Sequence, residues 1–367
     1  MTIRGLDGAM LALLGLAGAA GCGDNPTPAD VPDPRTCTAT WRTVYSPDDQ
    51  TLRVPFDREH TMALHGGQIY VNAWLSLVQQ RDGLWAIPTV GGQATQVFAG
   101  SLWSIWIEDD DLIFGQGPTL YRLPIRGGDP EPILTLHIFD PGLSSRLVES
   151  WALDRDALYW ILYDYVSVTV WRAPRDGSGD QQIAALPASV GSIGTASSVR
   201  MTLVGDQVFV TSDTDVWVVA KTGGEIRTVL SKADGNGYLI AMASDGGMLR
   251  WRSAGDLNHP RSELVRVTAE TSPGEALWSF DPRTTSIDRA WSDGAGGWYI
   301  AAEETATDAG RHLTIHSLAQ GEPRPTRLAC DPEISRVAFS GAGTSDGVFV
   351  LIGNTNAWEI AAVARQP

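Results

Sequence analysis

A serine between glycines is the first feature of the sequence that could carry catalysis. Gly343-Thr344-Ser345-Asp346-Gly347 matches the GxSxG pattern of a nucleophilic serine. That pattern needs a strand that turns sharply into a helix, because the turn exposes the serine hydroxyl above the sheet. Here the strand-like residues VFVLIG follow directly. We therefore interpret the segment as a hairpin turn without a catalytic role.

Segments that could hold a metal ion lack the ligands that such sites need. Residues 234–237 (DGNG) resemble the middle of an EF-hand loop, but Lys232 and Ala243 stand at its first and twelfth positions, where calcium needs carboxylates. His312 and His316 are four residues apart, which in a strand separates them by about 13 Å. We expect no metal and no cofactor. The other histidines occur singly and are expected in loops or on the surface: His60, His65, His137 and His259.

One unit recurs seven times in the chain. It contains an apolar stretch, a Gly/Asp-rich turn, a short strand, a loop, another strand and a Gly-rich turn. Four short strands per 40–50 residues, separated by glycine-rich turns, are typical of propeller blades. The sequence therefore predicts an all-β, seven-bladed β-propeller over residues 38–367, with six or eight blades as the alternative. The recurring strand reads IYV from 69, LIF from 112, LYW from 158, VFV from 208, LRW from 249, WYI from 298 and VFV from 348.

One of these units resembles a known family. The segment LYWILYDYVSVTVWRAPRDGSGD, residues 158–180, is similar to a YWTD-type propeller blade of the low-density lipoprotein receptor kind. The likeness rests on the LYW strand, the strand that ends near an arginine and the Asp-Gly turn, while Ile161-Leu162 replace the TD of the motif. The resemblance implies a propeller and identifies no partner.

The last unit has three strands, read from ISRVAFS, GVFVLIG and AWEIAAVA. A strand-like segment, residues 38–46, precedes the first full unit, and we predict that it supplies the missing outer strand. Such a closure leaves no open sheet edge. Cys37 directly precedes this segment and Cys330 ends the sixth unit, so we predict a disulfide between them. The alternative is two buried free thiols.

The first residues predict export. Residues 9–20 (AMLALLGLAGAA) have the length of a signal-peptide core, not of a membrane span. Residues 19–22 (AAGC) resemble the lipobox of bacterial lipoproteins, which implies a signal peptide over 1–21 and a lipid on Cys22. Ordinary cleavage after Ala19 is the alternative. Residues 22–37 are proline-rich and predict an extended tether. We expect an exported protein anchored by lipid in the cell envelope, in a membrane that the sequence leaves open.

The net charge of −16, without a basic run, predicts that the chain does not bind nucleic acid. The innermost strands, such as SWAL and IAMA, are mostly apolar, which argues against converging catalytic groups. We expect a noncatalytic propeller that binds a protein or a glycan through the face with the blade-to-blade connections. The loops 72–83, 252–263 and 302–312 are expected on that face. The alternative is a hydrolase that uses the loop carboxylates Asp256, Glu303 and Glu304.

Overall fold

The computed structural model divides the chain into two units, Met1–Thr36 and Cys37–Pro367. All described residues belong to the second unit and form strands, turns and bends, with no helix among them. The structure describes residues 41–46, 52–53, 61–75, 82–136, 147–163, 167–187, 199–212, 215–231, 237–243, 246–255, 260–268, 271–306, 310–322, 324–334, 337–353 and 358–365.

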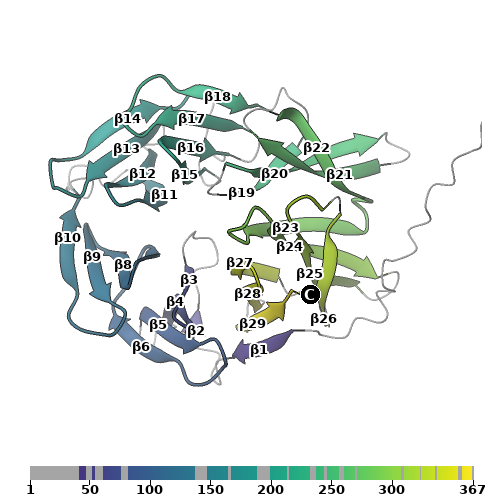
Figure 1. The fold of residues 1–367 in the computed structure, drawn as a ribbon, viewed down its shortest axis with the longest axis horizontal. Coiled ribbons are helices and arrows are strands. Elements are labelled where there is room, and N and C mark those ends of the chain that lie inside the picture. The colour runs from purple at the N-terminus through teal and green to yellow at the C-terminus, as the bar shows by residue number, and fades with distance from the viewer. Residues whose placement is uncertain are drawn as a thin grey trace, which may run out of the picture. The chain divides into compact units, whose positions relative to one another are not determined.

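Seven antiparallel sheets, here called blades 1 to 7, follow one another along the chain (Figure 1). Blade 1 consists of β2 (Leu52–Arg53), β3 (Met62–His65), β4 (Gln68–Leu75), β5 (Gly83–Pro88) and β6 (Thr95–Ala99). Blade 2 consists of β7 (Ile105–Glu108), β8 (Asp111–Gln116), β9 (Thr119–Pro124) and β10 (Glu131–Thr135). Blade 3 consists of β11 (Leu147–Leu153), β12 (Ala157–Tyr163), β13 (Val168–Pro174) and β14 (Gln181–Ala185). Blade 4 consists of β15 (Arg200–Val204), β16 (Gln207–Thr211), β17 (Val216–Ala220) and β18 (Arg227–Leu230).

The next two blades have longer strands. Blade 5 consists of β19 (Gly237–Met242), β20 (Met248–Gly255), β21 (Pro260–Thr268) and β22 (Thr271–Phe280). Blade 6 consists of β23 (Thr285–Ser292), β24 (Trp298–Ala306), β25 (Gly310–Leu318) and β26 (Thr326–Ile334). Blade 7 consists of β27 (Val337–Thr344), β28 (Gly347–Gly353), β29 (Trp358–Ala364) and β1 (Arg42–Tyr45). The predicted seven-bladed propeller is confirmed.

The predicted closure of the ring is confirmed too. Strand β1 pairs antiparallel with β29, with Arg42 opposite Ala362, and so becomes the outer strand of blade 7. The Arg42 guanidinium also donates hydrogen bonds to the carbonyls of Thr89 (2.7 Å) and Val90 (2.9 Å), in the turn between β5 and β6 of blade 1. Innermost strands β27 and β3 contact each other between the same two blades. Strand β1 therefore links blade 7 to blade 1, where the ring closes.

Paired glycines explain the turn that follows several third strands. Gly91 and Gly92 have φ angles of 94° and 133°, and Gly127 and Gly128 after β9 have nearly the same values, 92° and 138°. Residues with a Cβ rarely adopt these backbone angles, so the Gly-Gly sequence determines the position of the turn. The segment 343–347 is the tight hairpin between β27 and β28, as predicted, and no helix follows it.

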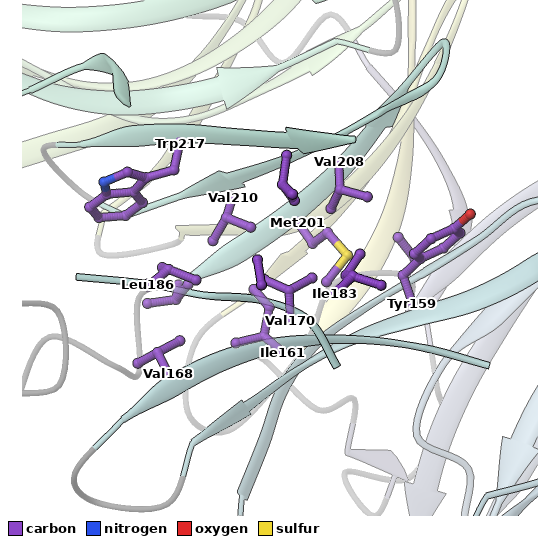
Figure 2. Packing of buried hydrophobic residues seen from close by; sticks show 14 of the residues in the cluster. Tyr159, Ile161, Val168, Val170, Ile183, Leu186, Met201, Val208, Val210 and Trp217 are labelled. Carbon is purple, nitrogen blue, oxygen red and sulfur yellow. The ribbon is translucent and has the colours of Figure 1, made fainter. Parts of the chain in front are cut away.

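Aromatic and branched apolar residues fill the spaces between blades. Figure 2 shows the contact of blades 3 and 4, where Tyr159, Ile161 and Val170 of one blade pack against Val208 and Val210 of the other. Large rings suit the wedge between two twisted sheets, and their burial supplies the main stabilising free energy. The aromatic residue in the middle of the second strand is buried in four blades, as Tyr70, Tyr159, Phe209 and Tyr299, and is half-buried in blade 7, as Phe349.

Candidate functional site

The direction of the strands defines two faces of the ring. Each innermost strand begins, and each second strand ends, at the face that carries the blade-to-blade connections, because neighbouring strands run antiparallel. We call this the connection face and the opposite one the hairpin face. Strands β20 and β21 extend to Gly255 and Pro260, and β24 and β25 to Ala306 and Gly310, on the connection face. The loops predicted over 252–263 and 302–312 are therefore mostly strand, which corrects the expectation.

A cavity of about 680 Å³ lies among the innermost strands of all seven blades. Most of its described lining is apolar or small, as predicted for these strands. Three charged residues also line it: Arg200, which begins β15, and the consecutive pair Asp288 and Arg289 in β23. Two arginines against one aspartate give the described lining one net positive charge, within a chain of net charge −16. The described hydroxyl residues of the lining are Thr202, Thr211, Ser212, Ser292 and Ser340.

Bulges in the innermost strands place some of these residues. The pairing of β23 with β24 shifts register between Ile287 and Arg289, so Asp288 has no partner opposite it. Strand β19 shifts in the same way around Ile240, which also lines the cavity. A bulge leaves one residue outside the ladder and redirects its side chain. In blade 6 that residue carries a charge.

Burial raises the pKa of Asp288, and the nearby carboxylate of Glu303 raises it further. Arg289 and the backbone N–H of Ala338, in the neighbouring blade, act in the opposite direction but do not outweigh burial. The residue is still reached by solvent from the channel. Asp288 can therefore take up a proton more readily than an ordinary aspartate and then act as a hydrogen-bond donor.

A second group of polar residues lies at the contact of blades 5 and 6. Glu304 Oε1 is 3.2 Å from His316 Nε2, and Glu304 Oε2 is 3.2 Å from a guanidinium nitrogen of Arg327. The three side chains are between 6% and 14% exposed. The ring of Trp278 from blade 5 lies 4.8 Å from the His316 ring. We call Glu304, His316 and Arg327 the Glu304 cluster.

Electrostatics hold the Glu304 cluster together. Burial alone would raise the pKa of Glu304, but hydrogen bonding and charge from His316, the charge of Arg327 and a hydrogen bond from Thr314 outweigh it and lower the pKa. Glu304 is thus ionised at neutral pH. Such a carboxylate, paired within the sheet, suits a structural role better than proton transfer.

The residues proposed for catalysis are Asp256, Glu303 and Glu304, and the two that the structure describes do not act on a common partner. Glu303 and Glu304 lie in β24, which corrects their assignment to a loop. Their carboxylates have different partners, since Glu303 pairs with Arg311 at 3.1 Å. Asp256 lies outside the described residues.

The histidines and cysteines are placed as follows. His312 Nδ1 lies 3.0 Å from the carbonyl oxygen of Asp331, and His65 lies 3.1 Å from Asp110. Cys330 is buried in β26. In the described ranges, no three His, Cys, Asp or Glu residues could together hold a metal ion. The histidines and cysteines that lie outside the described residues are His60, His137, His259, Cys22 and Cys37.

Sequence reasoning missed Arg200 and Arg289 as cavity residues. Arg289 stands in the stretch DRAW, residues 288–291, which precedes the second strand of its unit as an innermost strand does, so its two charged residues are a signal for the channel. Arg200 precedes the apolar residues of β15 and gives no signal without the strand boundary. No helix long and apolar enough to cross a bilayer occurs in the described part of the chain.

No protein-family model matches the chain, and no curated protein matches it. Two oligogalacturonate lyases, one in complex with manganese and one from Vibrio parahaemolyticus, align over 90% of this chain. The alignments cover 96% and 97% of the lyases, with 11% identity and TM-scores of 0.62 and 0.61. The β-propeller domain of the trilobed protease from Pyrococcus furiosus, which is described as having an open velcro topology, aligns over 89% of this chain and 97% of that domain. Its identity is 10% and its TM-score is 0.54. At these identities the similarity shows the propeller fold alone.

Proposed function

We propose that this protein is a noncatalytic, lipid-anchored propeller of the cell envelope that binds a protein or a glycan through its connection face. The observation that carries the proposal is the cavity, which includes Arg200, Thr211 and Ser212 at the strand ends of that face. Ligand sites are concave and combine apolar side chains with placed polar groups, and the lining of this cavity contains both. The extended strands of blades 5 and 6 enlarge the same face.

The binding face is tested by crosslinking from two matched serines. Ser286 is exposed in β23 near the connection face, and Ser178 is exposed in the turn between β13 and β14 on the hairpin face. A photo-crosslinking amino acid is placed at each position in the cell, and adducts are separated by mass. We expect discrete adducts from position 286 only. Equal adducts from both positions, or adducts from position 178 alone, would refute the assignment of the face.

The anchor is proposed on the residue pattern that ends at Cys22. A diacylated cysteine supplies the two chains that stable anchoring needs. The test is metabolic labelling with a fatty-acid analogue, followed by membrane fractionation. We expect the label and the membrane location to be lost in Cys22→Ala and kept in Cys37→Ala. Label that persists in Cys22→Ala would contradict lipidation at this residue.

A disulfide between Cys37 and Cys330 is proposed for the same oxidising compartment. Cys330 is buried in blade 6, and β1 follows five residues after Cys37 in the sequence and pairs with blade 7. A crosslink across this long loop would restrict the unfolded chain. Non-reducing peptide mapping is expected to give one linked pair of peptides containing these cysteines. A link from Cys22 to Cys37, or two free thiols, would overturn the pairing.

A further inference from the structure

We propose that the central cavity binds an acidic oligosaccharide, with a sugar carboxylate held by Arg200 or Arg289 and a sugar ring placed against Trp106 or Trp291. The inference rests on the proposed function, because it names the ligand class for the same face. All four side chains line the cavity. They come from three different blades, so the fold, not a local sequence motif, brings them together.

The two tryptophans supply flat surfaces in fixed positions. Trp291 lies across the backbone of Gly341 in the next blade, where an added Cβ would come within 2.6 Å of the indole. Trp106 contacts Trp103 edge to face at 5.8 Å, and Trp103 stacks on Trp151 at 3.9 Å. Apolar faces of sugar rings pack well on such indoles. Since these rings are held by neighbouring residues, binding orders little that was free before.

The charged groups select for a carboxylate. Arginine presents a planar set of donors that fits a carboxylate in two parallel hydrogen bonds. The described lining has one net positive charge, but the whole chain has a charge of −16. A dense polyanion such as nucleic acid is repelled by this field, whereas a sugar chain with separated carboxylates brings few charges into the cavity.

The remaining polar groups match the hydroxyl groups of a sugar. Thr202, Ser292 and Ser340 line the cavity and can both donate and accept hydrogen bonds. Asp288 adds a carboxyl group beside Arg289. The volume, about 680 Å³, lies in the range of roughly 300–1,000 Å³ that is usual for sites of small ligands. A short oligosaccharide segment fits this size.

The test is calorimetric titration of the purified full chain with a glucuronic acid trisaccharide and with its methyl ester, which has the same sugar rings without the charge. We expect binding of the acid and at least about tenfold weaker binding of the ester. Arg200→Gln and Arg289→Gln are the test variants, and at least one should weaken binding of the acid about tenfold or more. Arg122→Gln, which breaks an exposed pair with Glu131 in blade 2, is the matched control and should bind like wild type. Thermal melts of all variants identify any loss of folding.

Three outcomes would overturn the inference. Equal binding of acid and ester means that no carboxylate is recognised. Equal loss in Arg122→Gln means that binding follows overall charge and not the cavity. Absence of binding to both sugars means that the cavity does not take an oligosaccharide. Adducts from position 286 in the crosslinking experiment would then still support the proposed function, so the two failures are distinguishable.

Discussion

The contact of blades 3 and 4 and the contact of blades 5 and 6 hold equivalent sheets together with different chemistry. The buried cluster between blades 3 and 4 is apolar or aromatic throughout (Figure 2). Between blades 5 and 6, apolar residues such as Trp298 and Leu249 share the contact with the Glu304 cluster. The contact of blades 3 and 4 has an ion pair too, Lys221 to Asp154 at 2.7 Å, but its side chains are 20% and 23% exposed. The Glu304 cluster is more deeply buried, at 6–14% exposure, so it carries the larger desolvation cost and is weak evidence for extra stability.

The largest effect should come from the apolar contact. Trp217 is buried between blades 3 and 4, and Trp217→Ala should lower the free energy of unfolding by about 3–5 kcal/mol, because it leaves a large cavity. Trp171 occupies the corresponding position of blade 3 but is only half-buried, so Trp171→Ala should cost less. Urea unfolding followed by circular dichroism compares the two. Equal losses would contradict the role given to burial at this contact.

The ionic contact should respond to loss of one partner. Glu304→Gln should lower the free energy of unfolding by about 3 kcal/mol, since His316 and Arg327 would keep their places without the carboxylate. The neighbouring Glu303→Gln is the control, because Glu303 pairs with the mostly exposed Arg311, and it should cost less than about 1 kcal/mol. The same urea experiment measures both. A smaller loss in Glu304→Gln than in Glu303→Gln would mean that the buried cluster adds nothing.

These two contacts also show how far sequence reasoning reaches. Recurring short strands and glycine-rich turns predicted seven blades and the closure by residues 38–46, because each follows from local periodicity and from counting strands. The Glu304 cluster was not predicted. Glu304 was assigned to a loop, because β24 and β25 continue past the usual length of a blade strand. The register of these strands places Glu304 opposite His312 and Ile300 opposite His316, and the sequence does not give this register. Arg327 comes from a third strand, so only the fold brings it to Glu304.

Acid should act on both contacts. The pKa of Glu304 is lowered as described, and the pKa of Asp154, between blades 3 and 4, is lowered because Lys221 and the backbone N–H groups of Ala157 and Asp156 outweigh its burial. A lowered pKa stabilises the fold above the unfolded value and loses this effect as pH falls towards the folded one.

The expected result is a melting temperature that falls below about pH 4, near the unfolded values of 3.8 and 4.5. Glu304→Gln and Asp154→Asn should each flatten this fall, because each removes one titrating group. Calorimetric scans at several pH values measure it. A steeper fall in either variant would reverse the sign argued here.

The smallest effect separates an aspartate whose pKa is lowered from one whose pKa is raised within the same blade. Asp293 is buried, receives backbone hydrogen bonds from Ala295 and Gly297 and pairs with Arg365 at 3.0 Å, and its pKa is lowered. Asp288 has a raised pKa, so its charged form opposes folding and that cost grows as pH rises through the folded value. Asp288→Asn should therefore raise the melting temperature slightly at pH 7 and have no effect in acid, whereas Asp293→Asn should lower it at pH 7. If Asp288→Asn lowers the melting temperature at pH 7, Arg289 and the Ala338 N–H stabilise the ionised carboxylate by more than its burial costs.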